Sequence, residues 1–251
     1  MSFAVRYEEI MKKRGVTLPM RLTWHTVWVS LCLFVGSYWY LTLTEWGSMI
    51  VTTNKALADT AMILIGLSFV LSGLCYFWNF VDTKIVYRKY LGLAGFAFAL
   101  SHGVMSAVFY FLWKPFGYED NAIFILNHRW DFGAFLVPNE YAFYSALVAL
   151  SIFALMAAIS NQYAIHELGG LWWRRLLRVG YFAYVLGAVH LAIKNIPDWM
   201  NLFTLAEPAL PPLNLIVFLL VCGVVGLRLA LWLSLRKKAE ALPVSPTIVT
   251  L

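Results

Sequence analysis

The chain has 251 residues, of which 61% are hydrophobic and only 13% are charged. Soluble chains usually contain about 25% charged residues, and here the apolar residues gather in long blocks, so the composition excludes an ordinary soluble protein. The formal net charge of +6 comes from basic residues that flank these blocks. No soluble basic domain presents them to nucleic acid, so we expect no nucleic-acid partner. The sequence predicts a polytopic membrane protein.

Six apolar blocks are long enough to cross a bilayer, which requires about 20 residues each. Backbone amide groups in lipid must be hydrogen-bonded within their own segment, so each block predicts a helix. In chain order the blocks lie near 22–43, 56–80, 90–113, 141–159, 172–193 and 213–235. We therefore expect an all-α fold, with residues 1–251 forming one domain built as a bundle of six transmembrane helices.

The basic residues predict the orientation of this bundle, because Lys and Arg concentrate in cytoplasmic loops. They are abundant before the first block, between the second and third, at the start of the fifth and after the sixth. The other side carries only Lys55, Lys114, Arg129 and Lys194. We expect both termini to face the cytoplasm, in what is predicted to be a bacterial inner membrane.

Two histidines lie deep inside apolar blocks, His102 in the third and His190 in the fifth. His102 follows Lys89 by 13 residues and His190 follows Arg178 by 12. At 1.5 Å per residue, both imidazoles are expected roughly 18–20 Å from the inner boundary. That depth is beyond the midplane of a core about 30 Å thick. Two imidazoles at equal depth on facing helices would suit bis-histidine ligation of one haem iron.

Small residues accompany both histidines, and a flat porphyrin needs such residues beside it. Gly95 and Gly103 precede and follow His102, and Gly187 precedes His190. Close helix packing explains small residues equally well. From spacing alone, a hydrogen-bonded structural pair or a proton relay also fits the two histidines. The sequence contains no CxxCH motif, so a haem here would be non-covalent.

The segments around the histidines resemble a known family. "RKYLGLAGFAFALSHG" is similar to the third-helix signature of ferric reductase-like transmembrane domains, and "WWRRLLRVGYFAYVLGAVH" to their fifth-helix signature. Within that family the chain most resembles the haem-binding membrane subunit of the bacterial periplasmic methionine sulfoxide reductase system. The resemblance covers helices two to five and implies haem b as the cofactor.

In that family two haems usually stack across the membrane and carry electrons from cytoplasmic flavin or NAD(P)H chemistry to the outer face. The resemblance places His102 and His190 at the outer haem. The inner fifth-helix ligand would fall 13 residues before His190, where Leu177 stands. Leucine has no lone pair, so we expect one haem. Arg88 stands where the third-helix partner would be.

These observations predict a b-type cytochrome subunit of a larger redox or photosynthetic complex. It would bind one haem through His102 and His190 and pass electrons between a quinol or another membrane donor and a redox partner protein. Arg129 or Lys194 would neutralise the haem propionates. One alternative is a non-redox accessory subunit that keeps the fold as a scaffold. Another is a small transporter, which ordinarily needs paired carboxylates or broken helices near the midplane.

Overall fold

The computed structural model describes residues 18–44, 48–78, 81, 84–111, 129–131, 136–202 and 210–241. Their helices are α2 (Leu18–Thr44), α3 (Met49–Phe77), α4 (Tyr87–Phe111), α6 (Asn139–Ala158), α7 (Gln162–Leu202) and α8 (Leu213–Ala241). Each of these six contains a stretch long and apolar enough to cross a membrane. The predicted all-α fold with six transmembrane helices is therefore confirmed.

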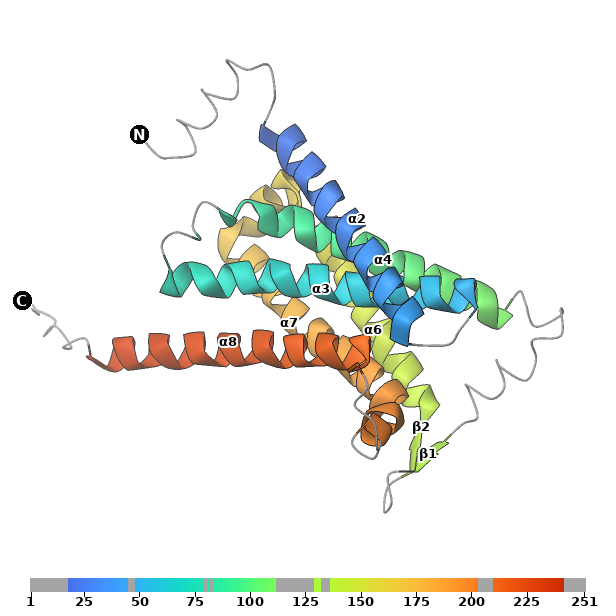
Figure 1. Cartoon of the computed structure of the whole chain (residues 1–251). Helices are drawn as coiled ribbons and strands as arrows, with labels where there is room; N and C mark the ends of the chain where they lie inside the picture. The colour runs from blue at the N-terminus through green and yellow to red at the C-terminus, as the bar shows by residue number, and fades with distance from the viewer. Residues whose placement is uncertain are drawn as a thin grey trace, which may run out of the picture.

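The helices alternate in direction along the chain. Figure 1 shows α2, α4 and α7 beginning on the same side of the bundle as α3, α6 and α8 end. We call this side the basic end, because it carries Arg21, Lys84, Lys89 and Arg236. The opposite side, where α3, α6 and α8 begin, is called the histidine end. Which end faces the cytoplasm stays a prediction from the distribution of charge.

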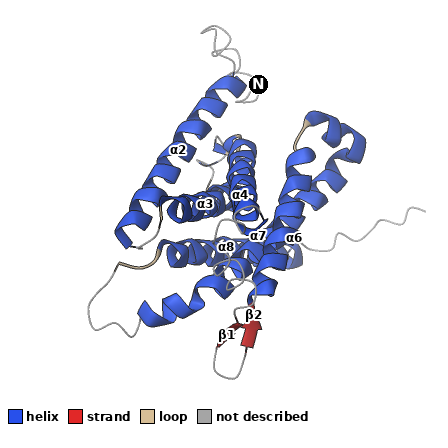
Figure 2. Ribbon diagram, turned by 90° about the vertical axis from the view of Figure 1, so that its right-hand side faces the viewer, coloured by secondary structure: helices blue, strands red, loops and turns tan. Residues whose placement is uncertain are grey.

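A short antiparallel ribbon precedes α6 and was not predicted. Its strands are β1 (Arg129–Asp131) and β2 (Leu136–Pro138), with Trp130 opposite Val137. Figure 2 shows the ribbon at the start of α6, into which β2 leads directly.

Helix α3 is the centre of the bundle. It packs most extensively against α4 and also contacts α2, α7 and α8, while α6 packs mainly on α7. It is also the span with the largest buried share, 44% of its apolar window. The other helices expose more apolar surface, for example Trp39, which is 67% exposed. Such surfaces are expected to face lipid, which is as apolar as a protein core.

Helix α3 begins earlier than the predicted block at 56. Ser48 has an extended backbone and its side chain accepts a hydrogen bond from the amide of Val51, which caps the helix. Hydropathy placed the polar residues after Ser48 outside the membrane helix. The structure includes them in α3, where Asn54 donates a hydrogen bond to Ser106 of α4.

Helix α7 is longer than the predicted block 172–193 at both ends. A kink at Gly169, with φ 70° and ψ 148°, divides a short initial segment from the long membrane helix. Positive φ is accessible to glycine at little cost, so the chain changes direction there. Asn161 caps the short segment, because its side-chain oxygen accepts a hydrogen bond from the amide of Ala164.

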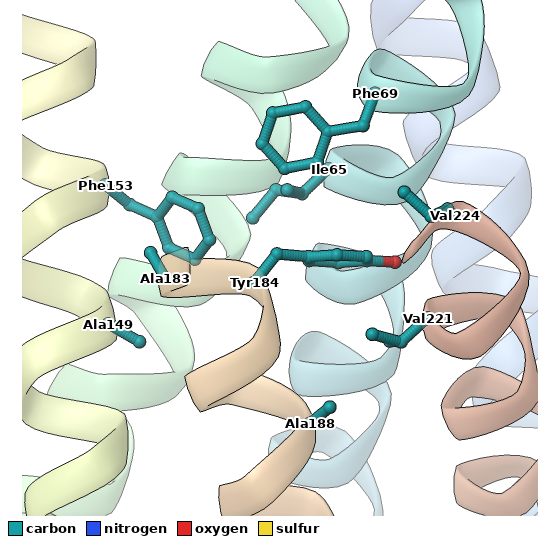
Figure 3. Close-up of a cluster of buried hydrophobic side chains, with 9 residues drawn as sticks. All are labelled: Ile65, Phe69, Ala149, Phe153, Ala183, Tyr184, Ala188, Val221 and Val224. Atoms are coloured by element: carbon teal, nitrogen blue, oxygen red, sulfur yellow. The ribbon is translucent and has the colours of Figure 1, made fainter. Parts of the chain in front are cut away.

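Tyr184 of α7 is the largest fully buried side chain among the described residues. Figure 3 shows its ring among Ile65 and Phe69 of α3 and Val221 and Val224 of α8, with Phe153 of α6 nearby. Its hydroxyl donates to the carbonyl of Met62, 3.0 Å away. This cluster joins α3, α6, α7 and α8, and so fixes the position of α7 relative to its neighbours.

Candidate functional site

The fold brings His102 of α4 and His190 of α7 together near the histidine end. Their ring centroids lie 6.4 Å apart, with an angle of 69° between the ring planes. Both side chains are half-buried. The sequence predicted equal depth on neighbouring helices, and the structure adds that the two rings are direct neighbours.

The His102 ring is oriented by α3. Its Nδ1 lies 3.0 Å from both the backbone oxygen and the side-chain oxygen of Asn54. The Asn54 amide in turn donates to the Ser106 hydroxyl at 3.0 Å, one turn beyond His102 on α4. Both partners of Nδ1 are acceptors, so Nδ1 carries the proton. The other nitrogen, Nε2, therefore keeps its lone pair.

The His190 ring is oriented by α6 in the same way. Its Nδ1 donates to the backbone oxygen of Ala142 at 2.8 Å. Ala142 is fully buried in the first turn of α6, and the same oxygen accepts the Ser145 hydroxyl at 2.9 Å. The His190 proton is thus also on Nδ1, and Nε2 is the nitrogen with the lone pair.

This pattern is the one that metal-bound histidines use. A ligating imidazole almost always donates its second ring proton to a carbonyl or carboxylate, which fixes the tautomer and makes the ligand more basic. Here both imidazoles donate from Nδ1, to Asn54 of α3 and Ala142 of α6. In its neutral form, each imidazole therefore keeps a lone pair on Nε2, the nitrogen that could bind a metal.

The separation of the rings fits a single iron. Two imidazoles bound to one metal from opposite sides have centroids about 6.2 Å apart, from two nitrogen–metal bonds of about 2.0 Å and two ring radii of about 1.1 Å. The observed separation is 6.4 Å. The angle between the planes is no obstacle, because each ring can rotate about its own bond to the metal.

One lysine, Lys194, lies within electrostatic range of the histidine pair, and a second, Lys55, lies within range of Lys194. Lys194 follows His190 by one helical turn and is half-buried, and Lys55 follows Asn54 directly. The charge of Lys194 acts on both imidazoles and on Lys55, so these groups are within electrostatic range of one another. Arg129, also predicted to meet the propionates, lies in β1, and its side chain is outside the described part.

The three predicted glycines all lie at close contacts between helices. A methyl group at Gly95 would come within 2.6 Å of Ile65 Cγ1, on α3. At Gly103 it would be 3.1 Å from Leu150 of α6, and at Gly187 3.1 Å from the sulfur of Met62. Helix packing accounts for each of these contacts, so a role in contacting haem stays a prediction for all three.

Around Leu177, where the sequence predicted that a second haem ligand is missing, the described residues include no second histidine pair. Leu177 is half-buried on α7. The guanidinium of Arg228 lies over the Tyr181 ring, 5.1 Å from its centroid, and Arg88 is within electrostatic range of both. This inner region therefore presents arginine and tyrosine side chains, where the family would place a haem ligand.

The remaining histidines are separate from the pair. His166 is 87% exposed, 3.4 Å from Glu167, and His25 is hydrogen-bonded to Tyr87 at the basic end. His128 lies outside the described residues. Nowhere in the described part of the chain do three His, Cys, Asp or Glu side chains gather to hold a metal ion.

Sequence reasoning missed the groups that orient the two rings. Asn54 appeared to lie outside the second membrane block, and only its position one turn inside α3 places it against His102. The Ala142 oxygen is a backbone atom, so no residue type signals it. Sequence reasoning also missed a cavity lined by His25 and Tyr87. No model of a known protein family matches this chain.

Proposed function

We propose that this protein is a b-type cytochrome membrane subunit that binds one haem between His102 and His190. The observation that carries the proposal is the pair of imidazoles at 6.4 Å, each donating from Nδ1 to a carbonyl oxygen. When bound, the haem would supply one-electron redox chemistry at its iron. The chain's own residues would set the ligand tautomers, the distance between the rings and the exclusion of water.

The charges near the site support haem over a bare metal ion. Haem carries two propionates, and Lys194 supplies a cation within electrostatic range of both imidazoles. A metal ion held by protein alone normally needs three or four protein ligands. The described residues offer the two imidazoles only.

The inner region supports one haem instead of two. Leu177 cannot donate a lone pair, and Arg88 and Arg228 place positive charge beside Tyr181. A haem iron there would have no histidine on α7. We therefore propose that electrons enter and leave through one haem, and that the chain is a distant member of the ferric reductase-like family with a shortened redox path.

The donor would be a quinol or another membrane carrier, and the acceptor a redox protein at the histidine end. We place the subunit in a bacterial inner membrane, with the basic end toward the cytoplasm. The positive-inside distribution of Lys and Arg supports this orientation.

The direct test is a redox difference spectrum with haem quantitation on the full chain purified in mild detergent. We expect one haem per chain, held by His102 and His190. His102→Leu and His190→Leu should lose the haem, while the control His166→Leu, at an exposed site, should keep it. A folded wild-type chain without a reducible Soret band would refute the proposal.

A scaffold subunit is the second candidate, because Leu177 interrupts the transmembrane path. The two candidates differ in what His190→Leu does to the assembled complex. Loss of electron flow in an intact complex supports the cytochrome. Unchanged electron flow in an intact complex would favour the scaffold.

A further inference from the structure

A cavity opens between α2, α3 and α4 near the basic end, well away from the histidine pair. Its volume is about 520 Å³, which is in the range of small-molecule sites. Leu91, on its wall, precedes His102 by about three helical turns of α4, or roughly 16 Å. The lining is mainly aliphatic and consists of His25, Thr26, Val29, Leu67, Val70, Leu71, Leu74, Lys84, Tyr87 and Leu91.

The polar groups of this cavity are few. His25 Nδ1 and the Tyr87 hydroxyl are 2.7 Å apart, and the two rings are nearly parallel, with centroids 6.1 Å apart and planes 13° apart. Thr26 uses its hydroxyl within α2, where it donates to the Leu22 carbonyl at 2.9 Å. The polar chemistry facing the cavity therefore comes from the histidine–tyrosine pair, with Lys84 on the lining.

The His25–Tyr87 hydrogen bond gives His25 Nε2 two possible roles. When the tyrosine hydroxyl donates to Nδ1, Nε2 carries the ring proton and is a donor. When Nδ1 donates to the tyrosine oxygen, Nε2 is an acceptor. A ligand oxygen that alternates between carbonyl and hydroxyl would be matched in both states. A phosphate or carboxylate head group, which only accepts, would use one state alone.

We propose that this cavity binds the ring of a quinone, with its head-group oxygen at His25 and Tyr87 and its apolar chain along α2 and α3. This inference rests on the proposed function, because it assigns a place to the membrane donor. The aliphatic lining suits the apolar body of such a molecule. The nearly parallel His25 and Tyr87 rings form an aromatic edge for its ring.

The test is equilibrium binding of decylubiquinone to the haem-loaded full chain in detergent, with bound quinone measured by extraction and chromatography. We expect saturable binding of about one quinone per chain. Leu71→Trp, which fills the cavity, should remove saturable binding. His25→Phe and Tyr87→Phe each delete one side of the polar pair, and each should raise the Kd about five- to tenfold.

Matched controls test whether the loss of quinone binding is specific to residues of the cavity. His166→Phe and Tyr163→Phe change the same residue types at exposed positions of α7, and both should bind as the wild type does. Haem content should be unchanged in every cavity variant. Quinone binding should persist in His102→Leu, so a failure of the haem proposal and a failure of this one give different results.

Three outcomes would overturn the quinone site. One is the absence of saturable binding in the folded wild type. Another is wild-type affinity in both Leu71→Trp and His25→Phe. The third is equally potent displacement of the quinone by oleate or phosphatidylglycerol, which would identify the cavity as a general lipid site.

Discussion

Replacing Asn54 by Leu tests whether the hydrogen bonds to His102 serve a bound metal. Asn54 is the natural target, because its side chain supplies an acceptor to the ring, whereas the His190 acceptor is a backbone oxygen that no substitution removes. Leucine has the same number of side-chain heavy atoms and the same branching at Cγ as asparagine. The change therefore deletes the side-chain acceptor and the hydrogen bond to Ser106 with little change in packing.

The expected magnitude follows from the two acceptors at His102. Removing the hydrogen-bond partner of a metal-bound histidine typically weakens metal binding 10- to 100-fold. In Asn54→Leu the backbone oxygen, also 3.0 Å from Nδ1, remains. We therefore expect a loss at the lower end of that range, about tenfold in haem affinity, which corresponds to about 1.4 kcal/mol of binding free energy.

The assay is the rate and extent of haem transfer from the purified protein to an excess of a haem-scavenging apoprotein. Thr53→Val is the matched control, because Thr53 is the neighbouring residue and its hydroxyl donates within α3 to the Met49 carbonyl. Wild-type haem retention in Asn54→Leu, or an equal loss in Thr53→Val, would contradict the assigned role of Asn54.

Asn54→Asp extends the same test to the redox potential. A carboxylate would still accept the Nδ1 proton, and its negative charge would favour the ferric over the ferrous state. We expect haem content to be retained and the midpoint potential to fall. A redox titration measures this shift, and an unchanged or higher potential would count against the contact.

Three further predictions concern charge and packing. Lys194→Ala should weaken haem retention several-fold, and more so at low ionic strength, where electrostatic attraction is least screened. Haem transfer from the wild type and the variant at two salt concentrations measures this loss. A loss of the same size at both salt concentrations would argue against pairing of Lys194 with a propionate. Gly95→Ala should lower the free energy of unfolding by about 1–3 kcal/mol, because its methyl group would lie 3.0 Å from a backbone nitrogen of α3; thermal unfolding should show no such loss in the control Gly223→Ala, where nothing lies within 4 Å. Tyr184→Phe should cost about 1 kcal/mol by removing one buried hydrogen bond, and an unchanged unfolding midpoint would show that this bond contributes nothing.

The sequence by itself determined that the chain forms six membrane-spanning helices. A bilayer accepts only segments whose backbone is internally hydrogen-bonded, so a run of about 20 apolar residues crosses it as a helix. It also indicated that His102 and His190 share a depth, because rise per residue converts sequence position into distance along a helix. That the two rings are direct neighbours became clear only once the helices were placed.

Only the tertiary structure decided which groups orient the two rings. Asn54 lies in a polar run whose hydropathy is that of a loop, and it enters α3 because Ser48 caps the helix and α4 supplies hydrogen-bond partners. The acceptor at Ala142 is a backbone oxygen, identical in every residue type. Such contacts join segments far apart in the chain, so helix packing decides them and local sequence pattern does not.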